Sequence, residues 1–285
     1  MRRRDFLGMP AVLGGLAAVS GTGMMMSRAA NAEAASGPAL PAAGGPAGVK
    51  AMVFDTFGTV VDWRGSIIRE GMVWGKEKNL QIDWGKFADQ WRAGYGPSME
   101  RVRKGELPWT KLDDLHRMIL EDLLKQYNIT LTEEEKAHWT NVWHRLSGWP
   151  DAVEGLSRLK KNYIIAPLSN GNVSLLVEMA KFAGLPWDTV FGADLFHHYK
   201  PDPEVYLGAV GLLSMKPSEV MMCAAHPPDL NAAKALGLRT GYVPRPLEGG
   251  PDRKPAPASP ETLAGFDVVA KDFVELAAKM EGRTS

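Results

Sequence analysis

Four clusters of polar residues have the types and positions needed for nucleophilic chemistry. Asp55 directly follows the apolar run Ala51–Phe54 and opens the string DTFGT. Three clusters lie downstream: Ser169 and Asn170 in LSNGN, Lys200 and Tyr206 in KPDPEVY, and His226 and Asp229 in AAHPPD. Parallel strands bring polar residues at their carboxyl ends to one edge of a sheet, so we expect a single site there. An oriented, partly desolvated Asp55 could act as a covalent nucleophile; the alternative is a structural turn or helix-capping aspartate.

Strand-like and helix-like segments alternate from residue 151 onward, which predicts a parallel sheet with helices on both faces. The expected strands are Ala51–Phe54, Tyr163–Leu168, Thr189–Phe191, Val220–Ala225, Thr240–Val243 and Val268–Val269. The expected helices are Asp151–Lys161, Val173–Ala183, Pro203–Leu213, Asp229–Leu236 and one from Phe273. Pro244–Pro260 is rich in proline and is predicted to be an irregular excursion. The fold class is therefore α/β, with a doubly wound, Rossmann-like core.

The segment Ser66–Gly148 breaks this alternation. It has helical periodicity and no convincing strand, and it holds most of the tryptophans of the chain. The chain therefore leaves the sheet after its first strand, builds a helical unit, and returns near Pro150. Such tryptophans usually form a core, so none is assigned to catalysis.

The first 32 residues read as an export signal. Arg2–Arg4 precede an uncharged stretch rich in Ala, Gly and Met, and Ala30-Asn31-Ala32 is a cleavage signature of small residues. The paired arginines indicate the twin-arginine route, with cleavage near Ala32 and a periplasmic product. An uncleaved membrane anchor is the alternative. Residues 33–48, rich in Ala, Gly and Pro, are expected to form a flexible linker.

Composition narrows the function classes. The chain has 33 basic and 33 acidic residues among 285, and no basic stripe indicates nucleic-acid binding. Cys223 is the only cysteine, which excludes an intramolecular disulfide and is typical of a small buried hydrophobe. No segment indicates an organic cofactor.

The four clusters, in this order, resemble the haloacid dehalogenase superfamily, and in detail its (S)-2-haloacid dehalogenase branch. The resemblance covers nearly all of residues 49–279. It implies a haloacid dehalogenase-like catalytic core at residues 49–65 and 150–280, with a helical cap domain at 66–149 that closes over the site. It also makes a homodimer plausible.

Two positions distinguish this branch from the phosphatases of the superfamily. Two residues after the nucleophile, phosphatases normally carry an aspartate that protonates the leaving oxygen, whereas this chain has Phe57. Four residues before Asp229, they carry a carboxylate that helps to hold Mg²⁺, whereas this chain has Ala225. Halide leaves as a weakly basic anion and needs neither group, so we expect no metal.

The resemblance also implies roles for the other residues. Arg92 and Asn170 would form the halide cradle. Ser169 and the backbone at Thr56 and Phe57 would bind the substrate carboxylate. Lys200 would lie beside Asp55 with Tyr206 nearby, and Thr59 would hydrogen-bond Asp55.

The chain departs from the family at His226. The resembled dehalogenases often carry Ser-x-Asn ahead of the aspartate, where the Asn helps to place the hydrolytic water. With the aspartates aligned, His226 takes the Asn position. It could preserve the hydrogen bonding, act as a base toward water, or indicate another substrate.

The sequence therefore predicts an exported hydrolase that converts short 2-haloalkanoic acids to 2-hydroxy acids. Asp55 would form an ester with C2 of the substrate, and water placed by Asp229 and His226 would hydrolyse that ester. The alternatives are a phosphatase of the same superfamily and a non-catalytic protein that binds a small organic anion.

Overall fold

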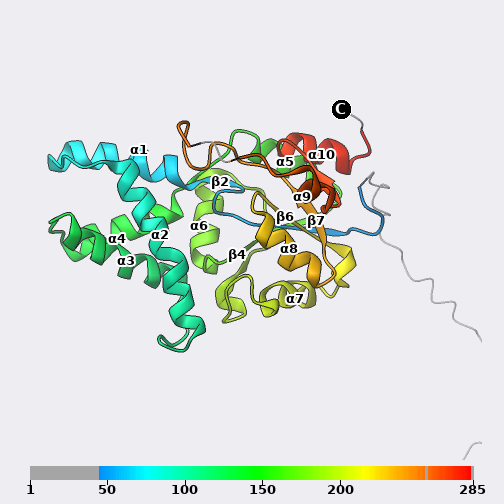
Figure 1. Cartoon of the computed structure of the whole chain (residues 1–285), viewed down its shortest axis with the longest axis horizontal. Coiled ribbons are helices and arrows are strands. Elements are labelled where there is room, and N and C mark those ends of the chain that lie inside the picture. The colour runs from blue at the N-terminus through cyan, green and yellow to red at the C-terminus, as the bar shows by residue number, and fades with distance from the viewer. Residues whose placement is uncertain (1–44, 254–255, 284–285) are drawn as a thin grey trace, which may run out of the picture. The chain divides into compact units, whose positions relative to one another are not determined.

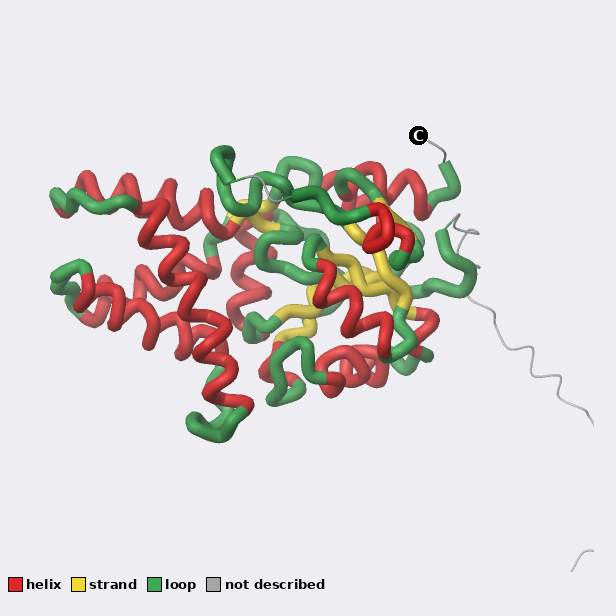
Figure 2. The backbone as a smooth tube through the Cα atoms, viewed as in Figure 1, coloured by secondary structure: helices red, strands yellow, loops and turns green. Residues whose placement is uncertain are grey.

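A parallel six-stranded sheet forms the centre of the computed structural model, which describes residues 45–253 and 256–283 (Figures 1 and 2). The strand order is β5-β4-β1-β6-β7-β8, and all neighbouring strands run parallel. The strands are β1 (Ala51–Phe54), β4 (Ile164–Ser169), β5 (Phe191–Gly192), β6 (Val220–Ala224), β7 (Arg239–Tyr242) and β8 (Val268–Val269). The central strand β1 is buried throughout and ends directly before Asp55, so the fold delivers this carboxylate to the carboxyl edge of the sheet.

Helices cover both faces of this sheet. Along β1, side chains alternate between the faces: Met52 and Phe54 join one apolar cluster, and Ala51 and Val53 join the other. The first face is covered by α5 (Ala152–Leu159), α6 (Val173–Ala183) and α10 (Phe273–Met280), and the second by α7 (Pro203–Leu212) and α8 (Pro227–Ala235). Figure 1 shows α5 and α10 on the opposite side of the strands from α7 and α8. Shorter helical segments are η2 (Ala193–Leu195), η3 (Pro217–Glu219) and α9 (Pro260–Ala264).

The helical insertion is a cap closed at its base by a short antiparallel ribbon. It consists of α1 (Trp63–Lys78), α2 (Trp84–Arg103), α3 (Leu112–Gln126), α4 (Glu133–Thr140) and η1 (Asn141–His144). The ribbon pairs β2 (Val61–Asp62) with β3 (Ser147–Gly148). Side-chain caps begin three helices, because Asp62, Asp83 and Thr132 each accept a backbone N–H from the first turn. The buried tryptophans pack on one another, as in the parallel pair Trp84 and Trp139 at 5.4 Å.

The structure confirms the expected α/β class and corrects several boundaries. β5 begins two residues later than predicted, and α8 begins at Pro227 rather than Asp229 because proline suits the first turn of a helix. Helix α1 begins at Trp63, three residues before Ser66, and the two-residue strands β2 and β3 are too short to give a sequence pattern. The predicted export signal and most of the predicted linker lie outside the described residues.

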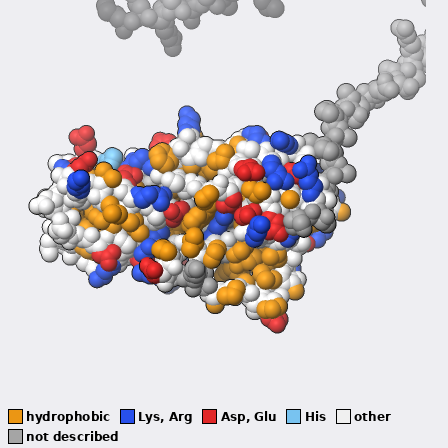
Figure 3. Space-filling model, turned by 90° about the horizontal axis from the view of Figure 1, so that it is seen from above, with side chains coloured by type: hydrophobic (Ala, Val, Ile, Leu, Met, Phe, Trp, Pro, Cys, Tyr) orange, Lys and Arg blue, Asp and Glu red, His pale blue; other side chains and the backbone are white. Residues whose placement is uncertain are grey.

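On the face drawn in Figure 3, basic and acidic side chains are interspersed. Within residues 45–253 and 256–283, every helix is too short or too polar to cross a membrane.

Candidate active site

Asp55 is the centre of a buried hydrogen-bond network. Its backbone N–H continues the pairing of β1 with β6 by donating to the carbonyl of Cys223 at 2.9 Å. Its Oδ1 accepts from Nζ of Lys200 at 2.9 Å. Its Oδ2 accepts from the hydroxyl of Thr59 at 2.7 Å and lies 2.9 Å from Nδ1 of His226. Although burial raises the pKa of Asp55, Lys200 and His226 outweigh that effect and hold it well below the ordinary range. Asp55 is therefore ionised, as a nucleophile must be.

Lys200 links Asp55 to the second carboxylate of the site. Its ammonium also donates to Oδ2 of Asp229, whose Oδ1 accepts from the hydroxyl of Tyr206. Burial lowers the pKa of Lys200, but Asp229 and Asp55 together raise it above its usual value, so the amine is charged. The pKa of Asp229 is raised, chiefly by burial. The site thus supplies its own cation between the two carboxylates.

The end of β4 positions Lys200 through Asn170. Oδ1 of Asn170 accepts from the backbone N–H of Lys200 at 2.6 Å, and its Nδ2 donates to the Lys200 carbonyl over a long 3.4 Å. Next to it, the buried hydroxyl oxygen of Ser169 accepts from the N–H of Gly171 at 3.1 Å. Among the hydrogen bonds of the described residues, Ser169 only accepts, so its hydroxyl hydrogen can serve a ligand. Asn170 therefore has a structural task besides the predicted halide contact.

His226 lies between two carboxylates, and the second of them, Glu248, is a residue that the sequence analysis missed. Nε2 of His226 is 2.9 Å from Oε2 of Glu248, and Oε1 of Glu248 accepts from the indole N–H of Trp63 at 3.0 Å. Because ionised carboxylates only accept, both ring nitrogens of His226 donate, and the ring is an imidazolium. Burial lowers the pKa of His226, but its bonds to Asp55 and Glu248 raise it to about 10. His226 therefore has no free nitrogen to act as a base in this state.

We call this network the polar floor; it comprises Asp55, Thr59, Lys200, Asp229, His226 and Glu248. Next to it, joined by the bond from Trp63 to Glu248, is a group of aromatic side chains packed around Arg92. We call this group the aromatic wall; it comprises Phe57, Trp63, Arg92, Tyr95, His116 and Trp143. Cζ of Arg92 lies 4.2 Å from the ring centroid of Tyr95, 5.6 Å from Trp63 and 5.9 Å from Phe57. The cap helix α2 thus brings Arg92 to the site, as predicted, and aromatic faces hold its guanidinium there.

Most of the buried polar atoms that lack a hydrogen-bond partner belong to this wall or adjoin it. Among the described residues there are seven such side-chain atoms, and five of them belong to Thr56, Arg92, His116 and Trp143. His116 is fully buried and stacks on Trp143 at 4.1 Å, with Phe57 at its edge. A buried polar atom without a partner is costly, so a cluster of them marks a place where a polar ligand can supply the bonds.

The structure brings the predicted site residues together from five separate segments. All of Asp55, Thr56, Phe57, Thr59, Ser169, Asn170, Lys200, Tyr206, His226 and Asp229 cluster at the carboxyl edge of the sheet, and Arg92 reaches them from the cap. The missed residues are Glu248 and four members of the aromatic wall: Trp63, Tyr95, His116 and Trp143. For the four members of the wall, the only indication in the sequence was the aromatic content of this part of the chain. Nothing in the sequence pattern indicated Glu248.

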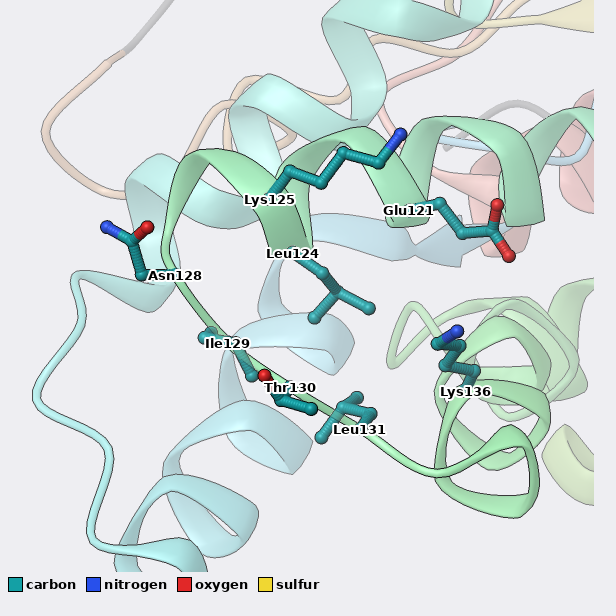
Figure 4. Close-up of a pocket in the computed structure, with 8 residues that line it drawn as sticks. All are labelled: Glu121, Leu124, Lys125, Asn128, Ile129, Thr130, Leu131 and Lys136. Atoms are coloured by element: carbon teal, nitrogen blue, oxygen red, sulfur yellow. The ribbon is translucent and has the colours of Figure 1, made fainter.

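A surface pocket of the cap is separate from this site. It lies between the end of α3, the following loop and α4, and residues such as Leu124, Ile129 and Leu131 line it (Figure 4). None of its lining residues belongs to the polar floor or the aromatic wall. The chemistry is therefore assigned to Asp55 and its neighbours.

Comparison with known proteins agrees with this geometry. The family model for haloacid dehalogenase-like hydrolases matches residues 49–237. The chain is 30% identical over 215 residues to (S)-2-haloacid dehalogenase 4A of Burkholderia cepacia, a match that covers 71% of this chain and 85% of that protein. The structure of an L-2-haloacid dehalogenase is 46% identical, with a TM-score of 0.75, and the match covers 81% of this chain and 99% of that one. A defluorinating L-2-haloacid dehalogenase is 44% identical, with a TM-score of 0.77 and coverage of 81% and 95%.

Proposed function

Since the chain belongs to the haloacid dehalogenase-like hydrolases, we propose that it hydrolyses short (S)-2-haloalkanoic acids to 2-hydroxy acids. The relatives named above carry that activity in their names. The observation that carries the proposal is the ionised, buried Asp55 next to the aromatic wall, which contains Arg92 and Phe57. This arrangement pairs a nucleophile with a cationic acceptor for a leaving anion, and Phe57 offers no acid for a phosphate leaving group.

Binding follows from the unpaired donors. The guanidinium of Arg92 and the side-chain amide of Asn170 receive the halogen, where negative charge develops. Ser169 and the backbone N–H groups after β1 receive the substrate carboxylate. The apolar surface of Phe57 excludes water from the reacting carbon.

Ester formation is a substitution at C2 of the substrate. A lone pair of Asp55 Oδ1 forms the new C–O bond while the carbon–halogen bond breaks, and the halide leaves with the bonding pair. Oδ1 is the better nucleophile because it accepts one hydrogen bond, from Lys200, whereas Oδ2 accepts two. Lys200 also keeps Asp55 ionised until it reacts.

Ester hydrolysis returns Asp55 to its carboxylate. Water attacks Cγ of Asp55 and gives a proton to Asp229, whose raised pKa suits it to this task. The Cγ–Oδ1 bond then breaks, and the departing oxygen takes that proton to become the hydroxyl of the product. The second proton of the water leaves when the carboxyl group of Asp55 ionises again, so the net products are the 2-hydroxy acid, halide and one proton.

A single turnover in ¹⁸O water tests the covalent route. With enzyme in excess over substrate, we expect unlabelled 2-hydroxy acid and one heavy oxygen in the peptide that contains Asp55. Label in the product of this first turnover, and none in the peptide, would show that water attacks C2 directly.

The phosphatase and the non-catalytic binding protein are tested together. We expect halide release from chloro- or bromo-acids, no turnover of para-nitrophenyl phosphate, and no loss of haloacid activity in EDTA. A strict Mg²⁺ requirement with phosphate release would favour the phosphatase. Binding of the organic acid without turnover by the unaltered protein would favour the non-catalytic protein.

We also propose that the twin-arginine pathway exports the protein to the periplasm. The support is the sequence of residues 1–32, with its paired arginines and the Ala-Asn-Ala signature. Replacing Arg3 and Arg4 with lysine should retain the protein in the cytoplasm, because recognition by the receptor requires guanidinium groups. An unchanged periplasmic yield would count against this proposal.

A further inference from the structure

Glu248 stands at the end of a continuous chain of bonds to the nucleophile. Its carboxylate bonds Nε2 of His226, whose Nδ1 bonds Oδ2 of Asp55, both at 2.9 Å. The other carboxylate oxygen accepts from Trp63 of the aromatic wall. Both oxygens of Glu248 are thus occupied, and its orientation is fixed at two points.

The loop that carries Glu248 is anchored to the nucleophile turn. The guanidinium of Arg245 binds both oxygens of Asp151 at 2.7 and 2.9 Å, and its Nε donates to the carbonyl of Thr59 at 2.8 Å. Gly58 of the same turn leaves room for Glu248, because a Cβ there would lie 2.0 Å from its Oε1. Gly58 also has a φ of +86°, a conformation that favours glycine. The two segments are therefore built to bring Glu248 to His226.

The bonds on Asp55 assign its two oxygens different tasks. When Oδ1 forms the ester, Oδ2 becomes the ester carbonyl oxygen, still facing Thr59 and His226. Attack of water on Cγ then shifts the π-bond electrons onto Oδ2, which becomes an oxyanion. A cationic donor already aimed at that oxygen stabilises the transition state without reorganisation.

Resting on the proposed dehalogenase mechanism, we propose that Glu248 is a positioning residue for ester hydrolysis. It fixes the ring and the proton of His226 so that Nδ1–H stabilises the oxyanion on Oδ2 of Asp55. His226 then works as a charged donor, and Asp229 is left as the group that takes the proton from water.

The charges around His226 favour the donor role over the base role. The neighbouring charged groups are Asp55 and Glu248 in direct contact, Lys200 beyond Asp55, Arg92 beyond Glu248, and Asp229 one turn further along α8. Ester formation removes the charge of Asp55, but Glu248 continues to hold the proton of His226. A base would need that proton to leave first.

Rapid-quench kinetics of Glu248→Gln test the proposal, with halide release reporting ester formation and 2-hydroxy acid reporting hydrolysis. We expect hydrolysis to slow by about 10–100-fold, as for other residues that orient a reacting group, while ester formation changes much less. The alkaline limb of the hydrolysis rate should also move toward neutral pH, because His226 loses its proton more easily. Glu248→Asp should restore part of the rate.

The matched control is Asp252→Asn, which removes the same charge from an exposed position in the same loop. Equal pH profiles for Glu248→Gln and Asp252→Asn would overturn the proposal. A shift of an acid limb instead would show that His226 is a base. If the unaltered enzyme releases no halide at all, the proposed function fails, which is a different result.

A measurement on the unaltered protein keeps the proposal testable if Glu248→Gln does not fold. Nitrogen NMR of the histidine rings, assigned with His226→Asn, should show both nitrogens of His226 protonated at pH 7.5. A neutral His226 ring at that pH would overturn the proposal.

Discussion

The polar floor and the aromatic wall adjoin, yet polar side chains are hydrogen-bonded on the floor and left without partners on the wall. On the floor, the two oxygens of Asp55 accept three hydrogen bonds, and His226 lies between two carboxylates. On the wall, the two ring nitrogens of His116 have no hydrogen-bond partner among the described residues, and the ring stacks on Trp143. The surroundings raise the pKa of His226 to about 10, whereas burial lowers that of His116 to about 3.

This difference separates the group that reacts from the surface that receives the substrate. The floor fixes charges before the substrate arrives, so little reorganisation is needed when charge moves. The wall keeps water away and leaves donors such as Arg92 to be satisfied by the ligand. Substitutions on the floor and on the wall should therefore change activity and stability by different amounts, and in some cases in opposite directions.

The largest loss of activity is expected from a substitution on the polar floor. Asp55→Asn removes the nucleophilic charge while it keeps the shape of the side chain, so halide release should fall by about 10⁴-fold or more. Circular dichroism should show an intact fold, because the change is nearly isosteric. Steady halide release from Asp55→Asn would show that another group attacks C2.

On the wall, Arg92→Lys should be the most damaging change. Lysine keeps the charge but loses the planar guanidinium that lies against Tyr95, so kcat/KM should fall by about 10²-fold or more. Arg101→Lys on an exposed part of the same helix is the control and should retain activity. Equal activity of the two variants would remove Arg92 from the halide cradle.

The sequence predicted the floor better than the wall, for a physical reason. Asp55, Lys200 and Asp229 follow or adjoin strand ends, and the topology of a parallel sheet brings such positions together. Glu248 lies in a proline-rich loop without periodicity, and its contact with Trp63 spans 185 positions of sequence. His116 occupies a position on α3 that its spacing does not distinguish from a core position. The contacts of Glu248 and His116 depend on tertiary packing, which leaves no local pattern in the sequence.

A smaller effect, on stability, is expected from His116→Phe. A buried unpaired polar side chain costs about 1–3 kcal/mol, so the variant should be more stable by that order at neutral pH. The pKa of His116 is lowered from 6.5 to about 3 in the folded protein. Below pH 6.5 the unfolded chain therefore binds a proton that the folded protein does not, so the wild-type protein loses stability as the pH falls below that value. Urea unfolding between pH 4 and 8 should therefore show a larger advantage for His116→Phe at low pH. A constant advantage across that range would mean that His116 is not held neutral.

The smallest effect on stability should come from His144, which joins the cap to the core. Its contribution depends on pH in the opposite direction to that of His116. Its Nε2 lies 2.9 Å from Asp113 of α3, and its Nδ1 lies 2.8 Å from Glu178 of α6. Burial lowers the pKa of His144, but its bonds to Asp113 and Glu178 outweigh that and raise it above 6.5. The contribution is therefore complete below pH 6.5 and is lost as the pH rises through the raised pKa.

His144→Gln should cost about 1–2 kcal/mol at pH 6, near the lower end of the range of about 1.5–3 kcal/mol for a hydrogen bond to a charged group, and less at pH 9. The exposed Glu178 keeps the value at the lower end, because solvent screens its charge. His138→Gln, which removes an imidazole from an exposed position of α4, is the control. Urea unfolding of the three proteins at both pH values measures the difference. If the cost of His144→Gln grew with pH, His144 would be held neutral as His116 is, and the cap would meet the core through an uncharged contact.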